Sequence, residues 1–150
     1  MATGNPNIQQ GTLNKVRGSV IVPGYTALNI NASHLGLDGI SLDLEEDFVM
    51  QEKTMTGVVN SPEPYVMATC TINLLRTQAL SLQWMQQAEQ QAMIGRIAVH
   101  SDTAAYTQRR VHNCSVLHAS PGRMNGTTAT VNLVIRGTYF INNNMWSVLL

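Results

Sequence analysis

Strict alternation of apolar and polar side chains is the feature that most constrains the fold of this 150-residue chain. The alternation extends over residues 40–45, 66–75 and 130–139. Because successive side chains of a strand point to opposite faces, each segment predicts a strand with one face on a core. Shorter segments are further strand candidates: 13–22, 26–30, 96–100 and 110–117.

One amphipathic helix is predicted over residues 79–93, from apolar side chains at four-residue spacing: Leu80, Trp84, Ala88 and Ala92. Thr77 or Ser81 is expected to cap its start, and Gly95 is expected to end it. Its glutamine-rich surface has two interpretations that the sequence leaves open. It is either a solvated face or an uncharged contact surface for a second subunit.

The predicted fold is therefore mainly β with one α-helix, an antiparallel β-sandwich or barrel packed with that single helix. A polar loop at 120–126 ends in Asn-Gly, which predicts a hairpin between two of the strands. A parallel βαβ fold would need several helices. The length suits one domain, residues 1–150.

An extended loop is expected at about residues 46–65, where neither a strand nor a helix pattern is clear. Its apolar side chains are unusual for a flexible loop: Val49, Met50, Met55, Val58 and Val59. Loops longer than about 12–15 residues are commonly functional or disordered. Burial of these side chains against a neighbouring subunit is favoured over packing on the parent domain.

The charges are unevenly distributed along a chain whose net charge is zero. Between residues 38 and 63, seven carboxylates face one lysine, whereas the rest of the chain carries eight cations and two carboxylates. Charged residues make up only 12% of the chain, about half the usual share of roughly 25%. A surface with so few charges is poorly protected against association, so an oligomer is expected.

No catalytic, cofactor or metal site is predicted. Adjacent strand residues point to opposite faces, so Glu45 and Glu46 would not share a cation, and an acidic rim facing solvent or a partner is favoured. His112, Cys114 and His118 lie along one predicted strand, where ligands diverge instead of forming a tetrahedron. Nucleophile, dinucleotide and phosphate-loop motifs are absent from the sequence.

Other function classes are disfavoured by composition. A dedicated nucleic-acid binder normally carries a basic excess, which this chain lacks. No apolar run approaches the roughly 20 residues needed to span a bilayer, so membrane insertion is not expected. Cys70 and Cys114 have no CxxC motif and are expected to be reduced, buried thiols.

The layout of the chain resembles the tail tube proteins of contractile-tailed bacteriophages, from about residue 11 to 139. The similarity is one of order along the chain. An early strand pair over 13–30 precedes the acidic strand 39–45 and the long loop through Thr54-Met55-Thr56-Gly57. The strand 66–74, the helix 79–93 and a closing hairpin that ends at 132–139 then follow. The tube subunits of tailocins and of type VI secretion share this fold.

The resemblance implies a structural virion protein without catalysis or cofactor. Such subunits form hexameric rings that stack into a hollow tube inside a sheath, and DNA passes through the tube without specific binding. The implied partners are further copies of the chain, the tail sheath, baseplate, tail terminator and tape measure proteins. The implied location is the virion tail, assembled in the cytoplasm of the host bacterium.

Inter-subunit contacts are expected to join acidic and apolar residues of the segment 43–59 to arginines of a second copy. The predicted contact residues are Asp43, Glu45, Glu46, Asp47, Glu52, Met55, Val58, Val59, Arg109, Arg110 and Arg123. Complementary charges would orient the stacking of rings. The lumen is expected to be polar or mildly acidic, because phosphate-binding arginines would slow the passage of DNA. The rival prediction is a compact β-sandwich that binds a carbohydrate or a peptide.

Overall fold

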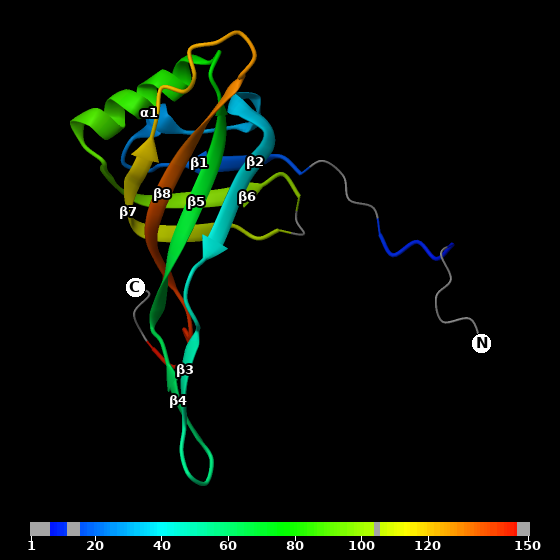
Figure 1. Ribbon diagram of the computed structural model, residues 1–150, viewed down its shortest axis with the longest axis vertical. Coiled ribbons are helices and arrows are strands. Elements are labelled where there is room, and N and C mark those ends of the chain that lie inside the picture. The colour runs from blue at the N-terminus through cyan, green and yellow to red at the C-terminus, as the bar shows by residue number, and fades with distance from the viewer. Residues whose placement is uncertain (1–6, 12–15, 104–105, 147–150) are drawn as a thin grey trace.

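The computed structural model describes residues 7–11, 16–103 and 106–146. Six strands form one antiparallel sheet in the order β1-β6-β7-β8-β5-β2, which curls into a nearly closed barrel (Figure 1). Their bounds are β1 Gly18–Ile21, β2 Leu35–Leu44, β5 Tyr65–Leu75, β6 Met93–Ser101, β7 Arg109–Ala119 and β8 Thr130–Phe140. The predicted class, mainly β with a single packed helix, is confirmed.

The barrel interior is filled by the side chains that the alternation assigned to it. In β5, Val66, Ala68, Cys70, Ile72 and Leu74 are all at most 1% exposed, while the residues between them are half-buried. In β8, the buried side chains are again every second one, and β5 and β8 pair without a register shift over their whole length. Burial of this apolar surface is the main source of the barrel's stability.

The α-helix α1, Ala79–Gln90, closes one end of the barrel (Figure 1). Trp84 is buried there, and its indole Nε1 donates a hydrogen bond to the carbonyl of Leu28 at 3.1 Å. Leu28 belongs to the short 3-10 helix η1, Thr26–Leu28. A second 3-10 helix, η2, Ala32–His34, leads into β2. The helix therefore packs on the core through the apolar stripe read from the sequence.

Several predicted boundaries were wrong. Residues 26–30 form η1 and a single bridge from Ile30 to Val20, because the 3-10 turn satisfies backbone groups that a strand would leave unpaired. The helix starts after Gln78 without a side-chain cap and ends at Gln90, since Gln91 is already extended. Gly95 lies inside β6 instead, with a φ of 82° where the pairing to β7 shifts register. Residues 12–15 of the first strand candidate lie outside the described residues.

The expected loop at 46–65 is an antiparallel hairpin of β3, Val49–Lys53, and β4, Val58–Pro62. It forms a separate two-stranded sheet that projects from the end of the barrel opposite α1 (Figure 1). β2 leads into β3 and β4 leads into β5, so the hairpin continues two strands of the barrel. Both of its faces are exposed, which removes the alternation by which the sequence revealed the other strands.

Candidate assembly interface

The hairpin is held together by its own backbone and by a short turn. Its register pairs Val49 with Pro62 at the base and Lys53 with Val58 near the tip. Thr54 closes the turn, where its backbone N–H donates to the carbonyl of Gly57 at 2.8 Å and its hydroxyl accepts from the N–H of Gly57 at 3.0 Å. The side chains of Gln51 and Asn60 form a cross-strand hydrogen bond of 2.9 Å.

Nothing in the described chain covers the apolar side chains of the hairpin. Met55 at the tip is fully exposed, and Val58 and Val59 are 57% and 58% exposed. Met50 and Phe48 are also exposed, and both outer edges of the two-stranded sheet are free of pairing. An isolated two-stranded hairpin is at best marginally stable in water, and an exposed apolar patch of this kind is typical of an interaction surface.

The base of the hairpin is fixed to the barrel by the turn that follows β8. Asn142 adopts a left-handed conformation with φ of 51°. Its side-chain amide donates to the carbonyls of Phe48 at 3.0 Å and Glu63 at 2.8 Å, one on each arm of the hairpin. The indole Nε1 of Trp146 donates to the carbonyl of Pro62 at 3.1 Å. These bonds set the direction in which the hairpin leaves the barrel.

The predicted acidic residues divide into two groups. Glu45 is paired within its own chain, since its carboxylate lies 2.7 Å from a guanidinium nitrogen of Arg136 and accepts a hydrogen bond from the hydroxyl of Thr69. Asp43, Glu46, Asp47 and Glu52 are exposed on β2, on the β2–β3 connection and on β3. Glu45 is therefore neutralised within its own chain by Arg136, while the other four carboxylates are exposed to solvent.

The predicted arginines do not gather at one place. Arg109 begins β7 and donates a hydrogen bond to the hydroxyl of Tyr139 at 3.2 Å. Arg123 is exposed in the β7–β8 connection. Arg110 belongs instead to a cluster that sequence analysis missed, which we call the basic cluster and define as Arg96, Arg110 and His112.

The basic cluster lies on the outside of β6 and β7. Ile97 and Val111, which pair with each other across these strands, are buried in the core, so the neighbouring cluster side chains point outward. Partial burial lowers the pKa of His112, and the positive charges of Arg96 and Arg110 lower it further. The ring of His112 also contacts the ring of Phe140, with 4.9 Å between centroids.

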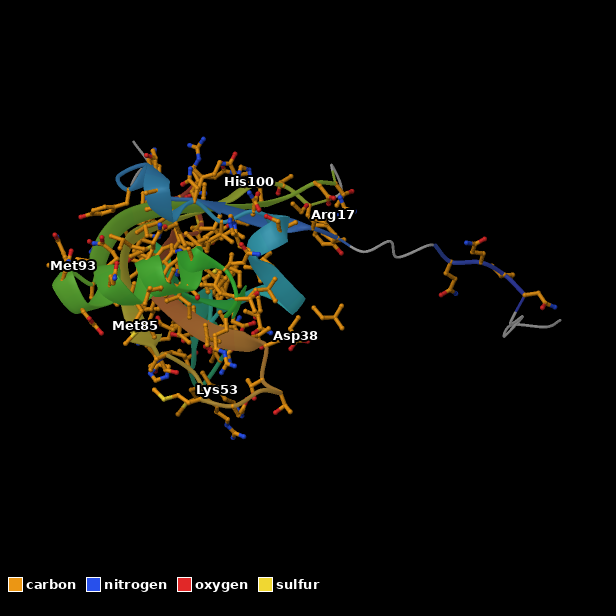
Figure 2. The ribbon with its side chains drawn as sticks, turned by 90° about the horizontal axis from the view of Figure 1, so that it is seen from above. Arg17, Asp38, Lys53, Met85, Met93 and His100 are labelled. Atoms are coloured by element: carbon orange, nitrogen blue, oxygen red, sulfur yellow. The ribbon has the colours of Figure 1, made fainter. Side chains whose placement is uncertain are left out.

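The barrel has one open seam, between β1 and β2. These end strands of the sheet order are not paired with each other, and they approach at Gly18 and Ile40. A cleft of about 790 Å³ lies along the seam, with Leu35, Ile40, Leu42 and Val99 among its apolar lining. Arg17, His100 and Asp38 line the same cleft, and Figure 2 shows Arg17 and His100 on one side and Asp38 on the other.

The residues weighed as metal ligands do not converge. The register of β7 shifts between His112 and Ser115, and Asn113 within it has a φ of 53°, so Cys114 turns into the core while His112 faces outward. Burial raises the pKa of the Cys70 and Cys114 thiols to about 12, which keeps both protonated and unreactive. Among the described residues, no three His, Cys, Asp or Glu side chains are grouped to hold a metal.

No helix of the described chain is long and apolar enough to cross a membrane. No protein-family model and no curated protein matches the sequence.

Proposed function

We propose that this chain is a structural virion subunit that assembles with copies of itself into stacked rings, forming the inner tube of a contractile tail. The observation that carries this proposal is the uncovered hairpin β3–β4, with exposed Met55, Val58 and Val59 and two free edges. The ring is proposed from the resemblance to tail tube proteins, whose rings are hexameric. The role of the tube as a conduit for the genome is proposed on the same ground. No catalysis or cofactor is part of this function.

Self-assembly accounts for the free strand edges and the exposed apolar side chains of the hairpin. Free strand edges and exposed apolar side chains normally promote aggregation, and a closed ring or an ordered stack covers them in a defined way. The bonds of Asn142 and Trp146 to the hairpin base hold one orientation of the projecting element. An element whose direction is fixed before association loses less conformational entropy on binding.

The outer face of β5 and β8 is suited to line a conduit. Its side chains between the buried ones include Thr69, Thr71 and Thr138, which are short and uncharged. The one arginine of β8, Arg136, is neutralised by Glu45. A surface of this kind offers DNA few unpaired cations, so DNA would pass with little electrostatic drag. In such a tail the chain would also contact sheath, baseplate, tail terminator and tape measure proteins.

Negative-stain electron microscopy of the purified protein tests the proposal, with rings or tubes as the expected result. Val58→Asp with Val59→Asp should leave dispersed, folded monomers, because charges on the hairpin cannot be buried against a second copy. Val58→Ile with Val59→Ile keeps an apolar, β-branched surface and should assemble as the parent chain does. A parent chain that is a dispersed monomer at all accessible concentrations would sink the proposal.

The seam cleft favours a second candidate function, a peptide-binding module. An extended peptide could pair with the free edge of β2 and place apolar side chains among Leu35, Ile40 and Leu42. A carbohydrate is less well served, because Tyr106 is the one aromatic side chain in the described lining. Binding of random-sequence extended peptides by a monomeric protein, lost on Ile40→Asp, would support this alternative.

A further inference from the structure

The basic cluster has no acidic partner within its own chain. In the part of the chain that the structure describes, the single ion pair is Arg136 with Glu45, and neither Arg96 nor Arg110 has a hydrogen-bond partner for its guanidinium. Both arginines are exposed, and both act electrostatically on His112. Like charges repel one another, and an anion that joined the cluster would relieve this repulsion.

A complementary acidic group exists on the same sheet but out of reach. Asp43 on β2 and Glu46 and Asp47 directly after it are exposed, and no hydrogen bond or ion pair of these carboxylates lies within the described residues. In the strand order, β8 and β5 separate β7 from β2. Measured along the sheet, three strand spacings of roughly 4.8 Å separate β7 from β2, a path of about 14 Å that exceeds the screening length of about 8 Å.

The contrast with Arg136 shows that distance decides which arginine is neutralised internally. Arg136 lies on β8, opposite Thr69 of β5, and Thr69 in turn lies opposite Asp43 of β2. From that position its side chain reaches Glu45. Arg110 on β7 lies one strand farther along the sheet order than Arg136, and Arg96 on β6 is separated from β2 by β1 across the open seam. Neither arginine has an anionic partner among the described residues, so an anion that pairs with them would come from another molecule.

We infer that the basic cluster is the docking site for Asp43, Glu46 and Asp47 of a second copy of this chain. This inference rests on the proposed function, and it identifies which surfaces of two subunits meet. The acidic group is at β2, an end strand of the sheet order, and the basic cluster is on β6 and β7. Two different surfaces that complement each other give a heterologous contact, the kind that closes rings or extends stacks.

The contact also accounts for the cluster in a tube that carries DNA. Two unpaired arginines beside a lumen would bind phosphates and slow the DNA. Carboxylates from the neighbouring subunit neutralise them, as Glu45 neutralises Arg136 within one chain. The second copy is therefore a better partner for the cluster than a nucleic acid, and each subunit would supply the anion that its neighbour lacks.

A charge-swap experiment tests the inference through two double variants, Arg96→Glu with Arg110→Glu and Glu46→Lys with Asp47→Lys. Each variant alone should bind itself more weakly, with the dissociation constant raised on the order of tenfold or more, because like charges then meet at the contact. An equimolar mixture should regain association, since each variant carries the surface that complements the other. Sedimentation velocity measures the assembly, and circular dichroism shows that each variant is folded.

Arg17→Glu is the matched control for the single cluster variant Arg96→Glu, with the same change in net charge at an exposed position outside the cluster. It should assemble like the parent chain, and a loss equal to that of the cluster variant would overturn the inference. If the parent chain assembles and the cluster variant assembles equally well, the docking site is wrong while the proposed function stands. If the parent chain never assembles, the proposed function itself fails.

A short double-stranded DNA added to the same samples tests whether the basic cluster binds nucleic acid instead of a second copy. The inference expects weak DNA binding that does not depend on Arg96 and Arg110 in the assembled protein. DNA binding that is abolished by Arg96→Glu with Arg110→Glu, in a variant whose self-association is unchanged, would assign the cluster to phosphates and contradict the inference.

Discussion

The barrel and the β3–β4 hairpin follow one another directly along the chain, yet they depend on burial in opposite ways. In the barrel, side chains such as Ile72 and Trp84 are almost fully covered by the chain's own core. In the hairpin, Met55, Val58 and Val59 stay exposed. The barrel is therefore expected to determine whether the chain folds, and the hairpin whether folded chains associate. Substitutions in the two regions should separate these outcomes.

The largest expected effect on folding is in the barrel, at Trp84. Trp84→Ala removes a side chain that is 1% exposed and breaks its hydrogen bond to Leu28, so it should lower the free energy of unfolding by about 3–5 kcal/mol. Leu82→Ala, on the same helix but 61% exposed, should change it by less than about 0.5 kcal/mol. Urea denaturation measures both. Equal losses in the two variants would contradict the assigned core.

Two glycines sharpen the same contrast. A Cβ at Gly137 in β8 would lie 2.7 Å from the sulfur of Cys114 and from the carbonyl oxygen of His112. Gly137→Ala should therefore destabilise the fold by about 1–3 kcal/mol through overpacking. Gly57→Ala at the hairpin tip meets nothing within 4 Å and should be neutral or slightly stabilising in thermal unfolding. A neutral Gly137→Ala would show that β7 and β8 are farther apart than described.

Asn142 connects the two regions, and its loss should affect the hairpin alone. Asn142→Ala removes two hydrogen bonds and places alanine, which tolerates the left-handed region less well than asparagine, at a φ of 51°. Amide exchange of the hairpin, including the N–H of Glu63, should quicken about tenfold, which corresponds to roughly 1.4 kcal/mol.

Asn142→Gly is the control, because it keeps the left-handed backbone and loses the amide. It should loosen the hairpin less than Asn142→Ala, by the backbone strain that glycine avoids. The exchange of β5 and β8 amides in the barrel should be unchanged in both variants. Faster exchange throughout the barrel would mean that Asn142 supports the whole fold.

The smallest expected effect is a pH dependence from His112 in the dissociated monomer. Partial burial together with Arg96 and Arg110 holds the pKa of His112 below its usual value of 6.5. Since the unfolded chain then takes up the proton first, stability is full above pH 6.5 and falls as the pH drops through that value towards the folded pKa. His112→Gln should remove this component from urea midpoints measured as a function of pH. An unaltered pH profile in His112→Gln would contradict it.

The sequence predicted the parts of the fold in which one face is buried and the other is not. The alternation over residues 66–75 specified the buried side chains of β5 because the core accepts only every second one. The hairpin escaped prediction as strands because no core lies on either of its faces. Propensity alone could not distinguish η1 from a strand at 26–30, where the Trp84 hydrogen bond to Leu28 accompanies a turn.

The charged residues of the candidate interface could be predicted only in part, because their pairing depends on strands that are distant in the sequence. Uneven charge along the chain indicated an acidic surface, but pairing between distant strands decides which carboxylate is satisfied. Glu45 and Arg136 meet only through the registers of β2, β5 and β8. Likewise, Arg96 and Arg110 become one cluster only when β6 and β7 pair. Neither the Glu45–Arg136 ion pair nor the Arg96–Arg110 cluster can be recognised from residues that are close together in the sequence.

The continuity of β2 with β3 and of β4 with β5 has a mechanical consequence. A pull on the hairpin moves β2 and β5 together along their axes, so the load falls on the backbone hydrogen bonds between β5 and β8, which run across that direction. Such a load shears many bonds at once, in place of opening them one after another as a zipper opens. β5 is also paired with β8 along its full length, so tension spreads into the middle of the sheet. A subunit anchored through its hairpin would therefore resist extension along that direction better than peeling at the β1 edge.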